Sequence, residues 1–370
     1  VENLPTNTKY SDFGTSYFND GIVFASSRGE GKLYKWNDQP FLDLYYKADT
    51  SQVAELFSDK INNRYHESST TFNKDGKTMY FTRKNFIDGK KGKDNKKITL
   101  LKIYRAQLVD EKWINITELP FNGDDYSTVH PALSADEKQL YFASDMPESI
   151  GSFDLFVVDI KSNGTFGSPK NLGSTINTEF REQFPFVSSN NTIYFASDGH
   201  FGLGGLDIFK SEVSNQTFSK PVNLSDVINS NLDDFAFIID EDKETGYFSS
   251  NRTGGKGNDD IYYFTQFQQF FVQGLVKNKN SLELIPGAKI TLLNNKNKII
   301  ANTTTNNEAF YSLEIDKKKF TSYLDEKVES TKKELLIIGK NRDEWKEKYI
   351  KIGKAKAEYK KSYDKRDQIL

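Results

Sequence analysis

The stretch YFASDGHFGLGGLDIF, residues 194–209, decides the fold of this chain. A short aromatic strand is followed by Ser-Asp, a glycine-rich loop and an acid that precedes a second apolar strand. A loop of this composition can cradle a phosphate, contribute to a metal site or form a tight turn. The rest of the chain distinguishes these alternatives, because the same pattern returns elsewhere.

Two close relatives of this stretch are YFASDMPESIGSFDLF at 141–156 and YFSSNRTGGKGNDDIYYF at 247–264. Four separate positions keep one spacing of 53 residues across the three copies. These positions are Phe142, Phe195 and Phe248; Asp145, Asp198 and Asn251; Gly151, Gly204 and Gly257; and Asp154, Asp207 and Asp260. A fixed period of this length indicates a repeat architecture.

Two looser copies lie upstream, from Gly21 and from Thr78, and each of the five copies has a lead-in segment. The lead-ins begin near Glu2, Ala54, Thr117, Lys170 and Val222. Within the fourth unit, QFPFVS, TIYFAS, LDIFKSEV and TFSKPVNL read as four short strands bounded by turn residues. Four strands in about 50 residues make a propeller blade. The sequence therefore predicts an all-β fold, a five-bladed β-propeller, or six-bladed if a segment upstream supplies another blade.

The glycine-rich loop does not fit a phosphate cradle, because a strand and not a helix follows its glycines. A calcium loop needs several converging acids, and Asn251 replaces the first acid in the last unit. The interpretation we favour is structural: Asp207 accepts backbone N–H bonds and the glycines supply positive φ. We expect the same of Gly151, Asp154, Gly204, Gly257 and Asp260, with no metal and no cofactor.

The motifs IYFASD, GGLDIF and PVNL resemble the WD40-like (PD40) repeats of Bacteroidetes OmpA-family outer-membrane proteins, including the PorE-like type of type IX secretion. In that family the propeller is followed by a small carboxypeptidase-regulatory-like β-sandwich and an OmpA-like peptidoglycan-binding domain. Residues 270–315 resemble the sandwich, with Pro286-Gly287 as a turn and alternating apolar residues on either side. The resemblance extends over residues 1–352, and no residue of this sequence corresponds to the OmpA-like domain.

We therefore expect three parts. Residues 1–268 form the propeller, and residues 269–352 form the sandwich with a charged insertion at 317–333. Two strands within 334–352 complete that sandwich, and residues 353–370 form a basic helix or linker.

Composition removes several kinds of chemistry. The chain of 370 residues contains no cysteine, so disulfides and thiolate sites do not arise, and its net charge of −2 indicates no affinity for nucleic acid. No apolar run reaches the roughly 20 residues of a transmembrane helix. His66, His130 and His200 follow no metal-binding spacing, and we expect surface or turn positions for them. The pairs Asp124-Asp125, Asp233-Asp234 and Asp259-Asp260 fit solvated or N–H-capping acids better than glycosidase acids. We expect no catalytic residues and no enzyme activity.

Three arginines, Arg28, Arg83 and Arg252, follow the second strand of their units, where propeller loops converge on one face. Together with Asp145 and Asp198 they are the candidate partner-binding positions, although local ion pairing explains the arginines equally well. The lysine-rich stretch 84–97 is expected to be a solvated hairpin tip, with anionic headgroups or glycan as the minority alternative.

These expectations combine into a non-enzymatic scaffold. The resemblance implies a location at the periplasmic face of the outer membrane, reached through an export signal that this sequence does not show. It also implies an outer-membrane barrel of the PorP/SprF type as partner, with peptidoglycan bound only through the domain absent here. The alternatives are a glycan- or peptidoglycan-binding module and a propeller enzyme acting on carbohydrate or peptide.

Overall fold

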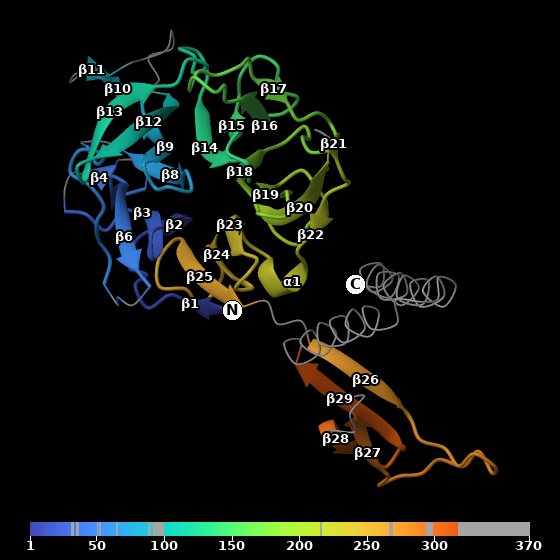
Figure 1. The fold of residues 1–370 in the computed structure, drawn as a ribbon. Helices are drawn as coiled ribbons and strands as arrows, with labels where there is room; N and C mark the ends of the chain where they lie inside the picture. The colour runs from blue at the N-terminus through green and yellow to red at the C-terminus, as the bar shows by residue number, and fades with distance from the viewer. Residues whose placement is uncertain are drawn as a thin grey trace, which may run out of the picture. The chain divides into compact units, whose positions relative to one another are not determined.

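The computed structural model contains a five-bladed β-propeller, as predicted (Figure 1). It describes residues 1–30, 33–34, 37–49, 51, 53–63, 66–87, 90–91, 100–214, 217–265, 269–293 and 299–316. The chain divides into two compact units, Val1–Gln266 and Phe267–Leu370.

Each blade is an antiparallel sheet whose strands follow one another outward from the centre. The first blade contains β2 (Asp12–Phe18), β3 (Gly21–Ser26), β6 (Asp43–Ala48) and β7 (Glu55–Leu56), and the second β8 (Glu67–Phe72), β9 (Thr78–Lys84), β12 (Leu101–Val109) and β13 (Lys112–Glu118). The third contains β14 (Thr128–Leu133), β15 (Gln139–Ser144), β16 (Asp154–Asp159) and β17 (Lys170–Asn171). The fourth contains β18 (Glu182–Val187), β19 (Thr192–Ser197), β20 (Asp207–Ser214), β21 (Thr217–Phe218) and β22 (Val222–Asn223).

The fifth blade closes the ring with strands from both ends of the propeller. It contains β23 (Asp234–Asp240), β24 (Thr245–Ser250) and β25 (Asp260–Thr265), and its outermost strand is β1 (Glu2–Asn3). Glu2 pairs with Tyr263 and Asn3 pairs with Tyr262. Because the first residues pair directly with the last blade, the ring closes with five blades and has no place for a sixth.

All five innermost strands share one irregularity, a β-bulge two residues after the strand begins. One residue at each bulge has positive φ, and these residues are Gly14, Ser69, His130, Phe184 and Ala236. A bulge bends its strand and increases the local twist. Its repetition around the axis shapes the wall of the central channel.

The core lies between the blades. Successive side chains of each second strand point to opposite faces of its sheet, so that each second strand contributes to the interfaces with both neighbouring blades. One aromatic residue of each second strand is at most 1% exposed, and these residues are Phe24, Phe81, Phe142, Phe195 and Phe248. Three of them are the 53-residue positions found in the sequence. Their burial explains why the period is kept: each phenylalanine fills the same place in its own blade.

The second unit is described for part of its length. β26 (Gln269–Leu275) pairs with β29 (Phe310–Asp316), and β27 (Lys289–Leu293) pairs with β28 (Ile299–Thr304). These antiparallel pairs agree with the β structure predicted for 270–315. The predicted insertion 317–333, the two strands within 334–352 and the segment 353–370 lie outside the described residues.

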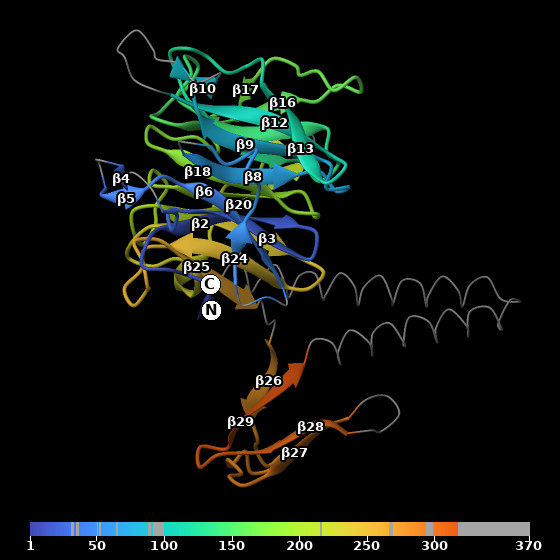
Figure 2. The ribbon, with the colours of Figure 1, turned by 90° about the vertical axis from the view of Figure 1, so that its left-hand side faces the viewer.

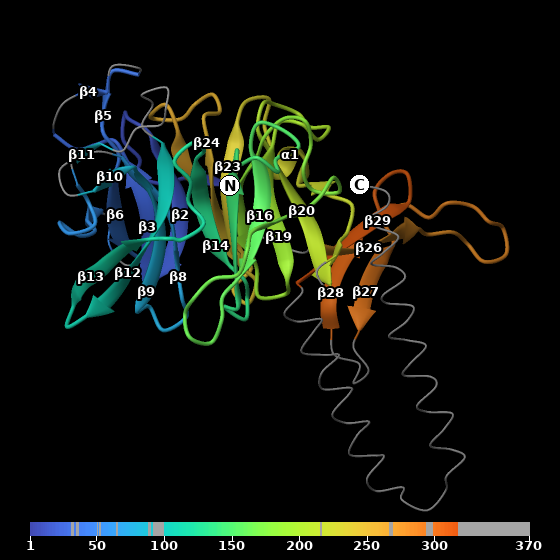
Figure 3. The same cartoon turned by 90° about the horizontal axis from the view of Figure 1, so that it is seen from above.

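One face of the propeller carries the lead-ins and the loops that join each second strand to the third. We call it the loop face. The hairpin of β4 (Leu33–Tyr34) and β5 (Gln39–Pro40) projects from this face (Figure 2). The short helix α1 (Ser225–Ile228) and the loop before β25 lie on the same side (Figure 3). Within the described part of the chain, no helix has the length and apolar character that crossing a membrane requires.

Candidate interaction face

A buried acid stands at the start of four of the five innermost strands, just beneath the loop face. The four acids are Asp12, Glu67, Glu182 and Asp234, each with no exposed surface, and Thr128 takes this position in the third blade. Each acid accepts the backbone N–H of the residue four positions earlier in its lead-in, for example 2.6 Å from Thr8 to Asp12. The acids therefore fix the lead-ins to the blades they precede.

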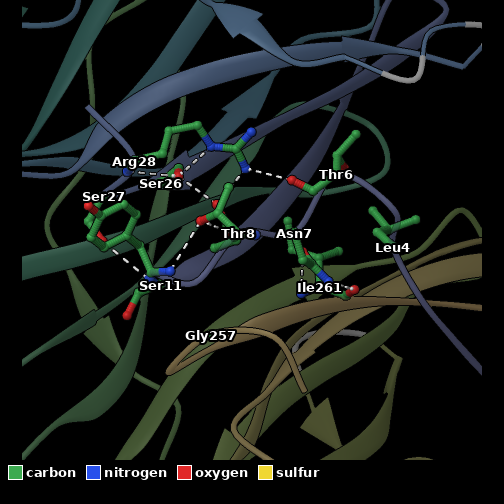
Figure 4. Close-up of polar contacts among 12 residues, drawn as sticks. Leu4, Thr6, Asn7, Thr8, Ser11, Ser26, Ser27, Arg28, Gly257 and Ile261 are labelled. Atoms are coloured by element: carbon green, nitrogen blue, oxygen red, sulfur yellow. Dashed lines mark hydrogen bonds and ion pairs between the residues drawn. The ribbon is translucent and has the colours of Figure 1, made fainter. Parts of the chain in front are cut away.

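In the first blade an arginine completes this arrangement (Figure 4). The Arg28 guanidinium lies 2.5 Å from the Asp12 carboxylate and donates to the carbonyl of Thr6 at 3.1 Å. It also lies over the rings of Phe24 and Tyr45, 5.1 and 5.0 Å from their centroids. We call this arrangement, an arginine held by a buried acid, a lead-in carbonyl and two rings, the arginine clamp.

The arginine clamp recurs in the second and fifth blades. Arg83 pairs with Glu67 and lies over Phe81 and Tyr104, while Arg252 pairs with Asp234 and lies over Phe248 and Tyr262. Their guanidinium groups donate to the carbonyls of Ile61 and Ile228. The side chains of the three arginines are only 8–20% exposed. Of the two explanations left open by the sequence, the structure therefore places Arg28, Arg83 and Arg252 in local ion pairs.

The remaining two blades modify the clamp. In the fourth blade His200 lies against the rings of Phe195 and Phe209, and its Nε2 is 2.7 Å from the carbonyl of Ile176. In the third blade the buried Met146, two residues after β15, takes the position of the arginine, and Thr128 takes the position of the acid. Acid and cation are thus lost together in the third blade, which avoids leaving one buried charge without its partner.

Burial disfavours charge on both members of the most enclosed pair. It raises the pKa of Glu67 to about 8, although the charge of Arg83 and the N–H of Asn63 act in the opposite direction. It also lowers the pKa of Arg83. Since the carboxylate still receives two hydrogen bonds from protein groups, we assign it a structural role.

Asp145, Asp198 and Asn251 occupy equivalent positions and perform one task. Asp145 accepts the N–H of Ser127 at 2.7 Å, Asp198 that of Arg181 at 2.8 Å, and Asn251 that of Asp233 at 2.8 Å. Each bond ties the loop after a second strand to the lead-in of the same blade. An amide oxygen serves as well as a carboxylate oxygen here, which explains the asparagine in the last copy.

The acids that end the glycine-rich loops accept backbone hydrogen bonds, as predicted. Asp154 accepts the N–H groups of Ile150 and Gly151, Asp207 those of Leu203 and Gly204, and Asp260 those of Lys256 and Gly257. A neighbouring asparagine also donates to two of them, Asn171 to Asp154 and Asn3 to Asp260. Among the described residues, no group of three or more acids and histidines could hold a metal ion.

The predicted reason for the glycines is wrong. Gly151, Gly204 and Gly257 do not have positive φ; among the described glycines of these loops only Gly254 does, at 91°. Instead, a Cβ on each would lie 2.4, 1.9 and 1.8 Å from the carbonyl oxygens of Phe180, Leu232 and Tyr10. Those carbonyls belong to the lead-in of the following blade. The glycines are therefore required because two backbones approach closely, not because of their own conformation.

Five asparagines repeat around the ring, one in each lead-in: Asn7, Asn62, Asn122, Asn177 and Asn229. Each accepts the N–H and donates to the C=O of one residue in a third strand, and the partners are Ile261, Leu44, Ile103, Leu155 and Ile208. The amide side chain thus substitutes for a strand neighbour. Sequence reasoning missed this set, although an asparagine stands in all five lead-ins.

Above these buried networks the loop face exposes large apolar side chains, which sequence reasoning also missed. Ile150 and Leu203 come from glycine-rich loops, Phe180 and Leu232 from lead-ins, and Phe201 follows His200. Their exposure ranges from 37% for Leu232 to 97% for Phe201. We call these five residues the apolar crescent. A signal for it was present in the sequence, because apolar residues stand in loops otherwise made of glycine and polar residues.

The central channel opens as a pocket on the face opposite the loops, with a volume of about 350 Å³. Tyr17, Phe72 and Phe186 supply aromatic walls, and Ser134 and Ser189 supply hydroxyls. A second hollow among the innermost strands is lined by His130, whose ring centroid lies 3.7 Å from that of Phe184 at a tilt of 33° and whose Nδ1 accepts the backbone N–H of Phe184 at 3.3 Å. Burial lowers the pKa of His130 to about 3. The expectation of a surface or turn position is wrong for His130, because the bulge of β14 turns it into the channel.

His66 is also enclosed. Its Nδ1 accepts the N–H of Leu42 at 3.2 Å, and the rings of Tyr34 and Phe41 flank it at 4.8 and 4.7 Å. Burial, together with the charge of Lys84, lowers the pKa of His66 to about 4. The three histidines occupy three unrelated sites, which agrees with their unrelated spacing in the sequence.

No protein-family model matches the chain, and no curated protein matches it. Among solved structures, it is similar to TolB from Acinetobacter baumannii (15% identity, TM-score 0.39), covering 70% of this chain and 55% of that one. It is also similar to a putative TolB from Agrobacterium tumefaciens (12%, 0.42, covering 85% and 96%). A third is the alpha-L-arabinofuranosidase from Lactobacillus brevis (13%, 0.45, covering 72% and 94%). Likeness at this level carries no argument about function. The fold is established by the sheets of this chain itself: in the residues that the structure describes, it is an all-β protein built on a five-bladed propeller.

Proposed function

We propose that this chain is a non-enzymatic scaffold that binds another protein through the loop face of its propeller. Following the sequence resemblance, we place it at the periplasmic face of the outer membrane. There it would link a membrane barrel of the PorP/SprF type to the cell envelope, in type IX secretion or in anchoring of a gliding adhesin.

The observation that carries the proposal is the apolar crescent. Exposed apolar side chains gathered on one face mark interaction sites more often than scattered ones do. The backbone beneath them is held by the acids, the asparagines and the histidine at the clamp position. The crescent is therefore presented on a rigid base, which lowers the entropic cost of binding.

This geometry assigns the candidate arginines a supporting role. Arg28, Arg83 and Arg252 are engaged with buried acids, so they hold the lead-ins in place. Replacing them would leave buried acids unpaired and would lower stability along with any binding. A test of the interface therefore belongs at the crescent, where the side chains have no structural task.

The test compares the tagged full-length protein, isolated from its native outer membrane, with the variant Phe201→Ser/Leu203→Ser. We expect a stoichiometric membrane protein with the wild type and its loss with the variant, both measured by quantitative mass spectrometry. The control is Val53→Ser/Val109→Ser, which alters apolar residues that are 66% and 45% exposed elsewhere on the propeller. Equal recovery of that protein with the crescent variant would contradict the proposal.

The pocket of the central channel favours a second candidate, a glycan-binding module. Its aromatic walls and hydroxyls are the groups that contact sugars, and its volume falls within the usual range for small-molecule sites. Retention of muropeptides or glycans by the isolated protein, lost on Phe186→Ala and kept with the crescent variant, would favour this candidate over the scaffold.

A further inference from the structure

We infer that the apolar crescent binds a polypeptide segment that is both apolar and basic. This inference rests on the proposed scaffold function and adds the chemistry of the partner. Three observations carry it: the crescent is continuous, its surroundings are acidic, and the repeat carries lysines where the crescent ends.

The crescent is continuous because its loops touch one another across blade boundaries. The Ser152 N–H bonds the carbonyl of Phe180 at 2.7 Å, which places the loop of Ile150 beside Phe180. The loop of Phe201 and Leu203 passes Phe180 at Gly199 and meets Leu232 at Gly204. The five apolar residues thus follow one path over the third, fourth and fifth blades.

The segments that carry the crescent are strongly acidic. Residues 145–151, 178–181, 198–205 and 230–233 contain five carboxylates and one guanidinium, in a chain whose net charge is only −2. The one guanidinium, that of Arg181, is already paired with Asp198 at 2.6 Å. With five negative charges against one positive charge, these segments make the local field around the crescent negative, which favours the approach of a cationic partner.

Two of these carboxylates are available to a partner. The side chains of Glu148 and Glu179 are exposed and, within the part of the chain that the structure describes, accept no hydrogen bond and form no ion pair. Glu148 lies two residues before Ile150, and Glu179 precedes Phe180. Each apolar residue at this end of the crescent therefore has an acid beside it.

Equivalent positions of the repeat show where the crescent stops. In the fifth blade Lys256 occupies the position of Ile150 and Leu203, directly before the glycine that recurs every 53 residues. Lys9 and Tyr10 occupy the positions of Glu179 and Phe180 in the first lead-in. The propeller fold thus accepts lysine at these positions. Ile150 and Leu203 in the third and fourth blades, and Glu179 in the fourth lead-in, are therefore properties of that surface and not requirements of the fold.

The negative field also selects the class of partner. Anionic headgroups and nucleic acid would be repelled by it, whereas lysine and arginine side chains gain from it. A polypeptide can present apolar and basic side chains together, and neighbouring charges at the rim of an interface improve specificity and association rate.

The experiment measures binding of a short fluorescent peptide that alternates leucine and lysine to the full chain, by fluorescence anisotropy. Two matched peptides replace lysine by glutamate or leucine by serine. We expect binding of the first peptide, roughly tenfold weaker binding of the serine peptide and no binding of the glutamate peptide. Added NaCl should weaken binding.

Variants then locate the site. Phe201→Ser/Leu203→Ser should lower the affinity roughly tenfold and keep the salt dependence, because the acids remain. Glu148→Gln/Glu179→Gln should lower the affinity and reduce the salt dependence. The controls are Val53→Ser/Val109→Ser and Glu55→Gln/Glu111→Gln, which change exposed residues outside the crescent and should bind as the wild type does.

The outcomes separate this inference from the function on which it rests. Equal binding of the lysine and glutamate peptides, or unchanged binding by the glutamate variant, would overturn the inference about the partner. If the crescent variant nevertheless fails to retain the native membrane protein, the scaffold function stands even though the inference about the chemistry of its partner is wrong. Sedimentation of the wild type as a dimer that the crescent variant abolishes would also overturn it, because the occupant would then be a second copy.

Discussion

At the scale of single residues, the side chains of the lead-in asparagines form hydrogen bonds that a neighbouring strand would otherwise provide. Asn177 is 2% exposed and bridges the N–H and C=O of Leu155 at 2.8 and 3.0 Å. Asn177→Ala leaves both groups buried without a partner, so we expect unfolding free energy to fall by about 2–4 kcal/mol. Urea unfolding measures this. The exposed control Asn190→Ala should change it by less than about 0.5 kcal/mol, and equal effects would contradict the bridging role.

A second residue, His130, makes stability depend on pH. Its pKa is about 3 in the folded protein and 6.5 when unperturbed, so the unfolded chain binds more protons between these values. Its contribution is therefore complete above pH 6.5 and is lost as the pH falls toward 3. His66 acts in the same direction, whereas the raised pKa of Glu67 acts in the opposite one.

The contribution of His130 is isolated by comparing the wild type with His130→Gln. From pH 7 to pH 5 the wild type should lose about 1–2 kcal/mol more unfolding free energy than the variant. Urea unfolding at the two pH values measures this difference. Parallel losses in the two proteins would show that His130 is not held neutral in the channel.

At the scale of elements, the short strand β1 has an importance that its two residues do not indicate. Its pairing with β25, together with Asn7, is the closure of the ring. The chain contains no cysteine, so Glu2→Cys/Tyr263→Cys introduces one defined pair at register partners. The oxidised variant should gain about 2–4 kcal/mol of unfolding free energy, because the crosslink constrains the unfolded chain. Reduction should return the unfolding free energy to the wild-type value. An oxidised form without added stability would contradict the closure of the ring by the pairing of β1 with β25.

At the scale of the whole molecule, every strand pair of the five blades lies within residues 1–265. A fragment of residues 1–266 should therefore fold alone and unfold cooperatively in urea, with a midpoint close to that of the full chain. Far-ultraviolet circular dichroism follows this transition. A fragment that unfolds without cooperativity would show that the propeller depends on the second unit.

The sequence was sufficient for the blades because their period is set by local chemistry. Phe142, Phe195 and Phe248 keep one spacing since each fills the same space in its blade, and the acid of each glycine-rich loop was correctly assigned from the turn it must close. The predicted count of blades followed from the lead-ins.

What the sequence could not provide were contacts between units of the repeat. The glycines looked like turn residues, because the carbonyl of Leu232 that approaches Gly204 comes from the next blade. The sequence could not decide between a binding role and a local ion pair for Arg252, since its partner Asp234 stands 18 residues earlier at the start of another strand. The apolar crescent combines residues of three blades, and only their arrangement in space brings Phe180 beside the loop of Phe201.

The closure of the ring also determines how the molecule would respond to tension. Since β1 and β25 are antiparallel, with Glu2 opposite Tyr263, residues 1 and 265 lie at the same end of the pair. A load applied between them peels the strands apart one hydrogen bond at a time, and the bonds from Asn7 to Ile261 at the far end break last. We therefore expect the ring to yield first at this latch, while the other four blades keep their packing and the loops they present.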